Sequence, residues 1–226
     1  MDPSIPRTGT HMPQWVVHYA NACGQLDGWT ERVSEAISEA RYRAEQVLAP
    51  ISLDVVVQVW PGQVIDCMGF VGYAPTGTMM QLTLDPGNAN FDSNMGEPFE
   101  RMVAHELHHV MRWRGPGYGQ TLGEALVSEG LAGHFCRLLY GSAPEPWESA
   151  LSGNELIDCA MRAKERWSEH AYRHGEWFFG QGPLPRWAGY SLGYALVERH
   201  LKQHTGEDAA SLVHEPAASF YVHLPD

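Results

Sequence analysis

The chain has 226 residues, of which 44% are hydrophobic and 11% aromatic, a composition typical of a globular protein able to bury a sizeable core. With 15 Lys and Arg against 27 Asp and Glu, its formal net charge of −12 argues against binding of nucleic acid or of an anionic membrane surface. The negative charge favours neutral or basic substrates, although solubility alone explains it equally well. No run of residues is long and apolar enough to span a bilayer.

Residues 1–13 contain two proline-containing turns and few apolar side chains, so we expect a flexible leader before the folded part. The start of the sequence has no basic region followed by an apolar stretch, which predicts no secretory signal and a cytoplasmic protein. The cysteines lie far apart and form no Cys-x-x-Cys pair. We therefore expect them to be free and buried: Cys23, Cys67, Cys136 and Cys159.

An α/β lobe is predicted from residue 14 to about residue 114. Its predicted elements are strands at 15–20, 51–60 and 78–84, a helix at 27–49, and a loop with a short strand at 63–75. The strands are rich in β-branched or alternating apolar residues and are bounded by glycine and proline. In the helix, apolar residues recur at helical spacing until Pro50 ends the pattern.

A second helix is predicted around the sequence Ala104-His105-Glu106-Leu107-His108-His109-Val110. Pro98 fits its first turn, and Gly115-Pro116-Gly117 ends it. Apolar residues recur at spacings of three, four and seven, which suits an amphipathic helix: Phe99, Met102, Val103, Val110 and Met111.

This helix carries the pattern His-Glu-x-x-His, which brings His105 and His109 to one face, one turn apart. Both imidazoles then reach one metal ion, and Glu106 is close enough to act on a water molecule without being a ligand. His108 can pair with His105 only in a geometry that leaves Glu106 without a role, so we interpret it as a neighbour that packs or hydrogen-bonds near the site. The alternative is that His105 and His109 are ordinary histidines of an amphipathic helix.

A third protein ligand is expected from the helix that follows. Thr121-Leu122-Gly123-Glu124 has the form of a capping box, which gives Glu124 a structural role. Glu129 lies in the middle of an apolar helix, where a carboxylate is costly to bury unless a cation partners it. Glu129 is therefore preferred over Glu124 as the ligand.

The remaining sequence is predicted to be mostly helical at 145–177, a loop at 180–185 and a helix at 187–204. A hydrolytic site needs an oxyanion donor besides the metal, and the candidates here are Tyr190, Tyr194 and His174. Tyr190 is preferred because Gly189 permits close approach, whereas the alternative for both tyrosines is helix packing. His134 either supports the site or is a helix histidine.

His105-Glu106-x-x-His109 with Glu129 twenty residues further on resembles the thermolysin-like (gluzincin) metallopeptidases, whose ligands are two histidines and a downstream glutamate. More closely, the stretches 104–109, 121–132 and 185–194 resemble an uncharacterised bacterial family of predicted Zn-dependent proteases. The resemblance covers the chain from about Trp15 to the C-terminus. It implies zinc and peptide-bond hydrolysis.

The resemblance has two further implications. A thermolysin-like enzyme pairs extended substrate with an edge strand just before the motif helix, a role that falls on Met80 to Thr83 unless this is an ordinary sheet strand. In the larger peptidases a supporting carboxylate is expected one turn after the ligand glutamate, where this chain has Gly133. Orientation of the histidines must therefore come from elsewhere.

These observations predict an α+β, zincin-like fold, with a small mixed or antiparallel sheet packed on the motif helix and a mainly helical C-terminal half. Residues 14–226 are expected to form one metallopeptidase domain, with lobes up to about 114 and over 119–226. The predicted function is a Zn2+-dependent peptidase acting on a peptide or protein, with metal ligands His105, His109 and Glu129 and catalytic residues Glu106 and Tyr190. The alternatives are a zinc-binding regulatory or interaction domain without turnover and a zinc hydrolase of a non-peptide amide.

Overall fold

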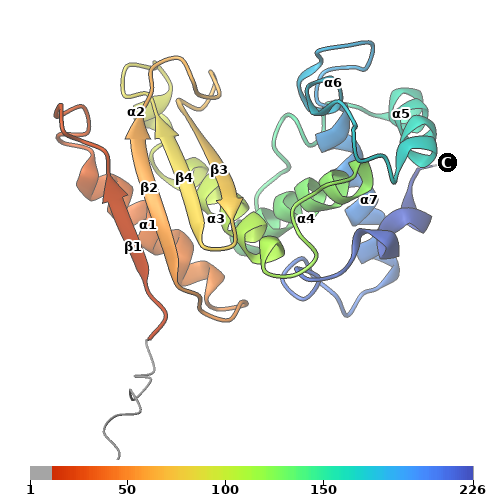
Figure 1. The fold of residues 1–226 in the computed structure, drawn as a ribbon, viewed down its shortest axis with the longest axis horizontal. Helices are drawn as coiled ribbons and strands as arrows, with labels where there is room; N and C mark the ends of the chain where they lie inside the picture. The colour runs from red at the N-terminus through yellow and green to blue at the C-terminus, as the bar shows by residue number, and fades with distance from the viewer. Residues whose placement is uncertain (1–11, 226) are drawn as a thin grey trace, which may run out of the picture.

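The computed structural model describes residues 12–225, so the leader predicted for residues 1–13 lies almost entirely outside the described part. The described chain is a mixed α+β structure. Its N-terminal half is a four-stranded sheet with helices packed on it, and its C-terminal half is helical (Figure 1). The predicted α+β class, with a small mixed sheet and a helical second half, is confirmed.

The sheet has the strand order β1 (Trp15–Tyr19), β2 (Leu53–Val59), β4 (Met79–Leu84), β3 (Phe70–Thr76). β1 and β4 both run parallel to β2, whereas β3 runs antiparallel to β4. Parallel pairing requires a crossover connection, and α1 (Thr30–Ala44) provides it between β1 and β2. This helix lies within the predicted range 27–49.

The edge strand near the motif helix is β3, not the segment predicted. Met80 to Thr83 belong to β4, which has β2 on one side and β3 on the other, so the prediction of an edge strand there is wrong. Met80 and Leu82 are fully buried, which favours an inner position for β4, and a turn after Thr76 folds β3 along its outer side. Pro75 suits β3, because a residue without an amide hydrogen is tolerated at a sheet edge.

The motif helix is α3 (Glu97–Trp113), preceded by the short α2 (Phe91–Asn94). α3 packs on α1, β3 and β4 with one side and on α4 (Leu122–Tyr140) with the other. Figure 1 shows it between the sheet and the helical half. Phe99 of α3 meets Phe70 of β3 edge to face, with ring centroids 5.1 Å apart. α3 is therefore the element that links the two halves through the buried core.

The helical half continues with α5 (Gly153–Arg166), α6 (His174–Phe179), α7 (Ala188–Gln203) and the 3-10 helix η1 (Ala217–His223). The prediction that 145–177 is mostly helical is wrong for 145–152 and 167–173, which are turns or irregular. Pro144 and Pro146 delay the start of α5 because proline removes a helix hydrogen bond. No helix in residues 12–225 combines the length and apolar character needed to cross a membrane.

α4 and α7 approach each other closely at two glycines. A Cβ atom on Gly130 would lie 2.1 Å from the Gly193 carbonyl oxygen, and one on Gly193 would lie 2.2 Å from the Leu126 carbonyl oxygen. Any larger residue at these positions would push the two backbones apart. The glycines therefore allow α7 to lie directly against the helix that carries Glu129.

The four cysteines are free, as predicted. Cys136 and Cys159 are buried, but Cys23 and Cys67 are exposed, so the expectation of burial is wrong for these two. Cys136 lies near the histidine motif, where its thiol donates to the Arg101 carbonyl oxygen at 3.1 Å and interacts with His105.

Candidate metal centre

The histidine motif lies in the middle of α3. Pro98 stands in the first turn, where its missing amide hydrogen leaves no hydrogen bond unmade, and Phe99, Val103 and Val110 are fully buried on the side that faces the core. This orientation brings His105 and His109 to the side of α3 that faces α4. The imidazole rings lie 4.6 Å apart at nearly right angles.

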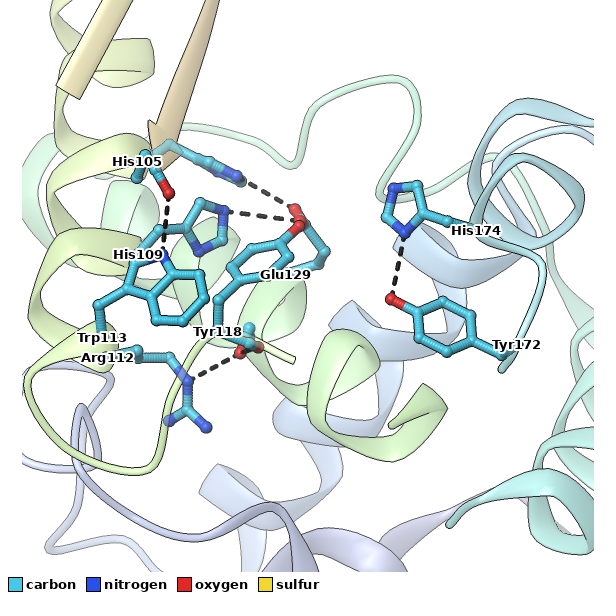
Figure 2. A network of polar contacts seen from close by, with 10 residues as sticks. His105, His109, Arg112, Trp113, Tyr118, Glu129, Tyr172 and His174 are labelled. Carbon is cyan, nitrogen blue, oxygen red and sulfur yellow. Dashed lines mark hydrogen bonds and ion pairs between the residues drawn. The ribbon is translucent and has the colours of Figure 1, made fainter. Parts of the chain in front are cut away.

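α4 begins with the predicted capping box. The Thr121 side chain accepts a hydrogen bond from the Glu124 amide, and a Glu124 carboxylate oxygen accepts one from the Thr121 amide at 2.9 Å. The Glu124 side chain therefore caps the N-terminus of α4. Glu129, more than one turn further along, is buried and points toward α3 (Figure 2).

The structure brings His105, His109 and Glu129 together. Nε2 of His105 lies 3.2 Å from Oε2 of Glu129, and Nε2 of His109 lies 3.5 Å from Oε1. One ligand atom from each residue lies within 4.8 Å of the others, a spacing that allows one metal ion to contact all three. Figure 2 shows both imidazoles directed at the carboxylate.

The buried carboxylate of Glu129 needs a positively charged partner. Burial alone would raise the pKa of Glu129, but the charges and hydrogen bonds of His109 and His105 outweigh burial and hold that pKa well below its usual range. Burial opposes a charge on His105 as well, yet hydrogen bonds to Cys136 and Glu129 raise its pKa well above the usual value. Without a metal, a proton on histidine supplies the positive charge that the buried carboxylate needs.

The donor set fits zinc. Two imidazole nitrogens and one carboxylate oxygen form one of the ligand sets of catalytic zinc, which leaves a further coordination position open. The exposed fractions agree with an opening on one side, because the Glu129 and His109 side chains are 4% and 5% exposed while His105 is 20% exposed.

Glu106 lies beside these residues but is not one of the three. It is buried, and burial raises the pKa of its carboxyl, although the charges of His109 and His105 oppose the rise. The Ala74 backbone amide of β3 is near enough to lower this pKa slightly. A Cβ atom on Gly72 of β3 would lie 2.3 Å from Cγ of Glu106, so the glycine makes room for this side chain.

Tyr118 contacts the cluster and was not predicted. It lies in the glycine-rich connection between α3 and α4, where its hydroxyl donates to Oε1 of Glu129 and its ring packs edge-on against His109. The Ser128 hydroxyl donates to the Tyr118 carbonyl, and the buried Arg112 donates to Ser128 at 2.8 Å. The sequence feature that could have indicated this role is an aromatic residue among glycines directly after the motif helix.

Two residues predicted as oxyanion donors lie near the cluster: His174 is across from Glu129 in Figure 2, and Tyr190 is close enough to feel the charges of Glu129 and Glu106. Burial raises the pKa of Tyr190 well above its usual value, and the nearby charges of Glu129 and Glu106 raise it further. His174 accepts or donates a hydrogen bond at 3.2 Å to the hydroxyl of Tyr172, a residue not predicted (Figure 2). Burial raises the pKa of Tyr172 to about 12, helped by Glu129. These phenols therefore stay protonated and able to donate.

Tyr194 and His134 face elsewhere. Their rings stack with centroids 4.0 Å apart, and Nε2 of His134 contacts the Tyr194 carbonyl oxygen at 3.0 Å. The Tyr194 hydroxyl accepts from Arg137 near the surface. Burial lowers the pKa of His134 to about 4 and keeps it neutral. Both residues therefore serve in helix packing, the alternative left open by the sequence.

His108 points away from the cluster. It is fully buried, packs on Phe135 and contacts the Ala209 carbonyl oxygen at 3.1 Å through Nε2. Burial and the nearby Arg112 charge lower its pKa well below the usual value, so it stays neutral. This agrees with its interpretation as a neighbour rather than a ligand.

A carboxylate does occupy the space beside Gly133, but it comes from a distant residue. A Cβ atom on Gly133 would lie 2.2 Å from Oε1 of Glu148, which belongs to the connection between α4 and α5. Glu148 is buried, and burial raises its pKa to about 7 against the effects of the Glu145 amide and the His105 charge. Among these neighbours, Cys136 interacts with His105 through its thiol, and Glu148 is close enough to feel the His105 charge.

The fold and these residues define an α+β protein with a histidine–carboxylate cluster suited to a divalent metal. The chain belongs to the family described as "Predicted Zn-dependent protease (DUF2268)", whose model matches residues 30–221. It is also similar to the uncharacterized protein YjfC of Bacillus subtilis (strain 168), with 25% identity over 151 residues. That match covers 60% of this chain and 49% of the relative, so the chain spans about half the length of YjfC. No solved structure matches the chain significantly.

Proposed function

We propose that this protein is a zinc-dependent peptidase with a zincin-like, gluzincin-type site. His105, His109 and Glu129 bind Zn2+, and Glu106 is the general base. The strongest support is the convergence of two imidazoles and a carboxylate beside a second buried carboxylate that is not part of the trio. A purely structural metal site has no use for that second carboxylate. When bound, zinc supplies a Lewis acid that brings the pKa of water toward about 7.

Glu106 is positioned to move the proton. Its carboxylate accepts the proton of the attacking water and delivers it to the leaving amine, as base and then acid. A pKa raised by burial favours this double role, because the group both holds and releases a proton closer to neutral pH. The Glu106 side chain packs against Gly72 of β3, which limits its movement between the two transfers.

Tyr190 is the proposed donor to the oxyanion. Its phenol lies near both Glu129 and Glu106 and remains protonated, which a hydrogen-bond donor requires. Phe178 packs edge to face on the Tyr190 ring, with centroids 5.0 Å apart, and limits its movement. Tyr172 and His174 lie across from Glu129 in Figure 2, and we assign them a role in binding the substrate.

We place the substrate peptide along β3. Among the described residues, β3 pairs with β4 on one side only, so its other side is an edge to which an extended peptide can be added. The Ala74 carbonyl oxygen accepts from the Trp113 indole at 2.8 Å, which fixes β3 to the end of α3. Because the Glu106 side chain lies against Gly72 of β3, a chain beside β3 would pass close to Glu106.

The proposed substrate is a peptide or protein, and the proposed location is the cytoplasm. The net charge of −12 favours a neutral or basic peptide over a nucleic acid or an anionic membrane surface.

The test is Glu106→Gln in the full chain, followed by elemental analysis and digestion of a peptide library. We expect the variant to retain zinc and lose hydrolysis. Glu97→Gln is the matched control, because Glu97 is exposed in the first turn of the same helix and should leave both properties unchanged.

Two results would reject the proposal. The first is a wild-type protein that binds zinc and cleaves no peptide. Such a protein would be a regulatory domain or a hydrolase of another amide, and a screen of amide substrates would distinguish these two alternatives. Full activity in Glu106→Gln would remove the assigned general base.

A further inference from the structure

A second group of histidines lies at the C-terminal end of the chain. His200 and His204 are one turn apart near the end of α7, and His223 comes from η1. One ring nitrogen from each lies within 4.8 Å of the others. The rings of His200 and His204 stack 4.2 Å apart, and the ring of His223 stands nearly perpendicular to both.

Hydrogen bonding leaves lone pairs available in this group. Nε2 of His200 lies 2.7 Å from Oε2 of Glu207, and because a carboxylate only accepts, we assign the proton to Nε2, which in the neutral ring places the lone pair on Nδ1. His200 is 5% exposed, and its buried Nδ1 has no hydrogen-bond partner. His204 donates from Nδ1 to the His200 carbonyl oxygen at 2.9 Å, which leaves the lone pair of its Nε2 free. A carboxylate behind a ligating histidine is the usual arrangement at metal sites.

The surroundings favour a cation. The three histidines line a cavity of about 500 Å³ whose wall also includes the carboxylates of Glu207 and Glu215. Arg199 of α7 directs its guanidinium to the Leu224 carbonyl oxygen. The cavity is therefore lined by imidazole and carboxylate groups, and it is large enough for a hydrated ion.

Packing alone does not account for this arrangement. His200 does pack on Phe220, with ring centroids 4.5 Å apart, and a phenylalanine or leucine would serve that contact. With imidazoles in this position, Nδ1 of His200 is buried without a hydrogen-bond partner. Burying that atom costs free energy unless an ion binds it.

We propose that His200, His204 and His223 form a second metal site, which takes a divalent transition-metal ion of the Zn2+ class and fastens η1 to α7. Imidazole ligands select such ions over Mg2+ and Ca2+, which prefer oxygen. The site shares no residue with the cluster on α3 and α4, and it does not depend on the proposed peptidase activity.

The experiment measures bound zinc in the full-length chain after equilibrium dialysis. His204→Gln is the main variant, since His204 is exposed, and His223→Gln removes the ligand on the other element. His170→Gln is the control, because His170 is exposed and outside both groups. All three changes are also made in a His105→Gln background, which weakens the first site.

We expect His204→Gln and His223→Gln each to lose one zinc equivalent relative to the wild type and to His170→Gln. In the His105→Gln background, added zinc should raise the melting temperature, and His204→Gln should abolish the rise while the metal-free melting temperature is unchanged. Two full equivalents in both His204→Gln and His223→Gln would overturn the proposal. Loss of peptidase activity in His105→Gln with the second equivalent retained would separate the two sites.

Discussion

Tyr118→Phe tests the candidate metal centre most directly. The change removes one hydroxyl, which donates to Oε1 of Glu129, and keeps the ring that packs on His109 with centroids 4.7 Å apart. Glu129 is 5% exposed, so water has little access to replace the lost donor. The carboxylate keeps its contacts with His105 and His109, which limits the loss to one hydrogen bond.

The size of the effect follows from that geometry. A hydrogen bond to a charged group contributes about 1.5–3 kcal/mol, so the free energy of unfolding of the metal-free protein should fall by that amount. In a chain of this length, each kcal/mol lost lowers the melting temperature by about 2–4 °C. The melting temperature should therefore fall by about 3–12 °C. Zinc affinity should fall by roughly 10- to 100-fold, because Tyr118 orients a ligand.

Urea denaturation followed by circular dichroism measures the first quantity, and calorimetric titration with zinc measures the second. Tyr42→Phe is the matched control, because Tyr42 lies on α1 and is 63% exposed. If Tyr118→Phe were as stable as this control and bound zinc equally well, Tyr118 would not hold Glu129, and the reasoning from burial would fail.

Two further predictions concern residues around the site. The pKa of Glu148 is raised by burial to about 7, so its contribution to stability is present below the unfolded pKa of about 4.5 and is lost as pH rises through the folded value. This amounts to about 3 kcal/mol between pH 4.5 and 8, and Glu148→Gln should remove this part of the slope in urea titrations, while an unchanged slope would contradict it. Gly130→Ala should cost about 1–3 kcal/mol or prevent folding, because its Cβ atom would lie 2.1 Å from the Gly193 carbonyl oxygen. Gly206→Ala, with open space around it, should be close to neutral in the same thermal melts, and equal stability of the two variants would disprove the close helix contact.

Local patterns were readable from the sequence because they depend on neighbouring residues. The motif helix follows from apolar spacing and from Pro98, and the capping box at Thr121 and Glu124 closes within four positions. The placement of Glu129 followed from the cost of burying a carboxylate, which also depends on the helix around it.

Contacts between distant segments were decided by the tertiary structure alone. Strand order depends on which strands pair, so β4 became an inner strand and β3 the edge, which periodicity does not encode. Glu148 reaches the space beside Gly133 only because the chain after α4 folds back. His223 meets His200 for the same reason, since η1 packs on α7. The sequence by itself thus indicated the motif helix and the candidate ligands His105, His109 and Glu129, but it did not indicate the group around His200. Packing of the chain determined which of them meet, because a contact across many residues depends on the path of all the elements between them.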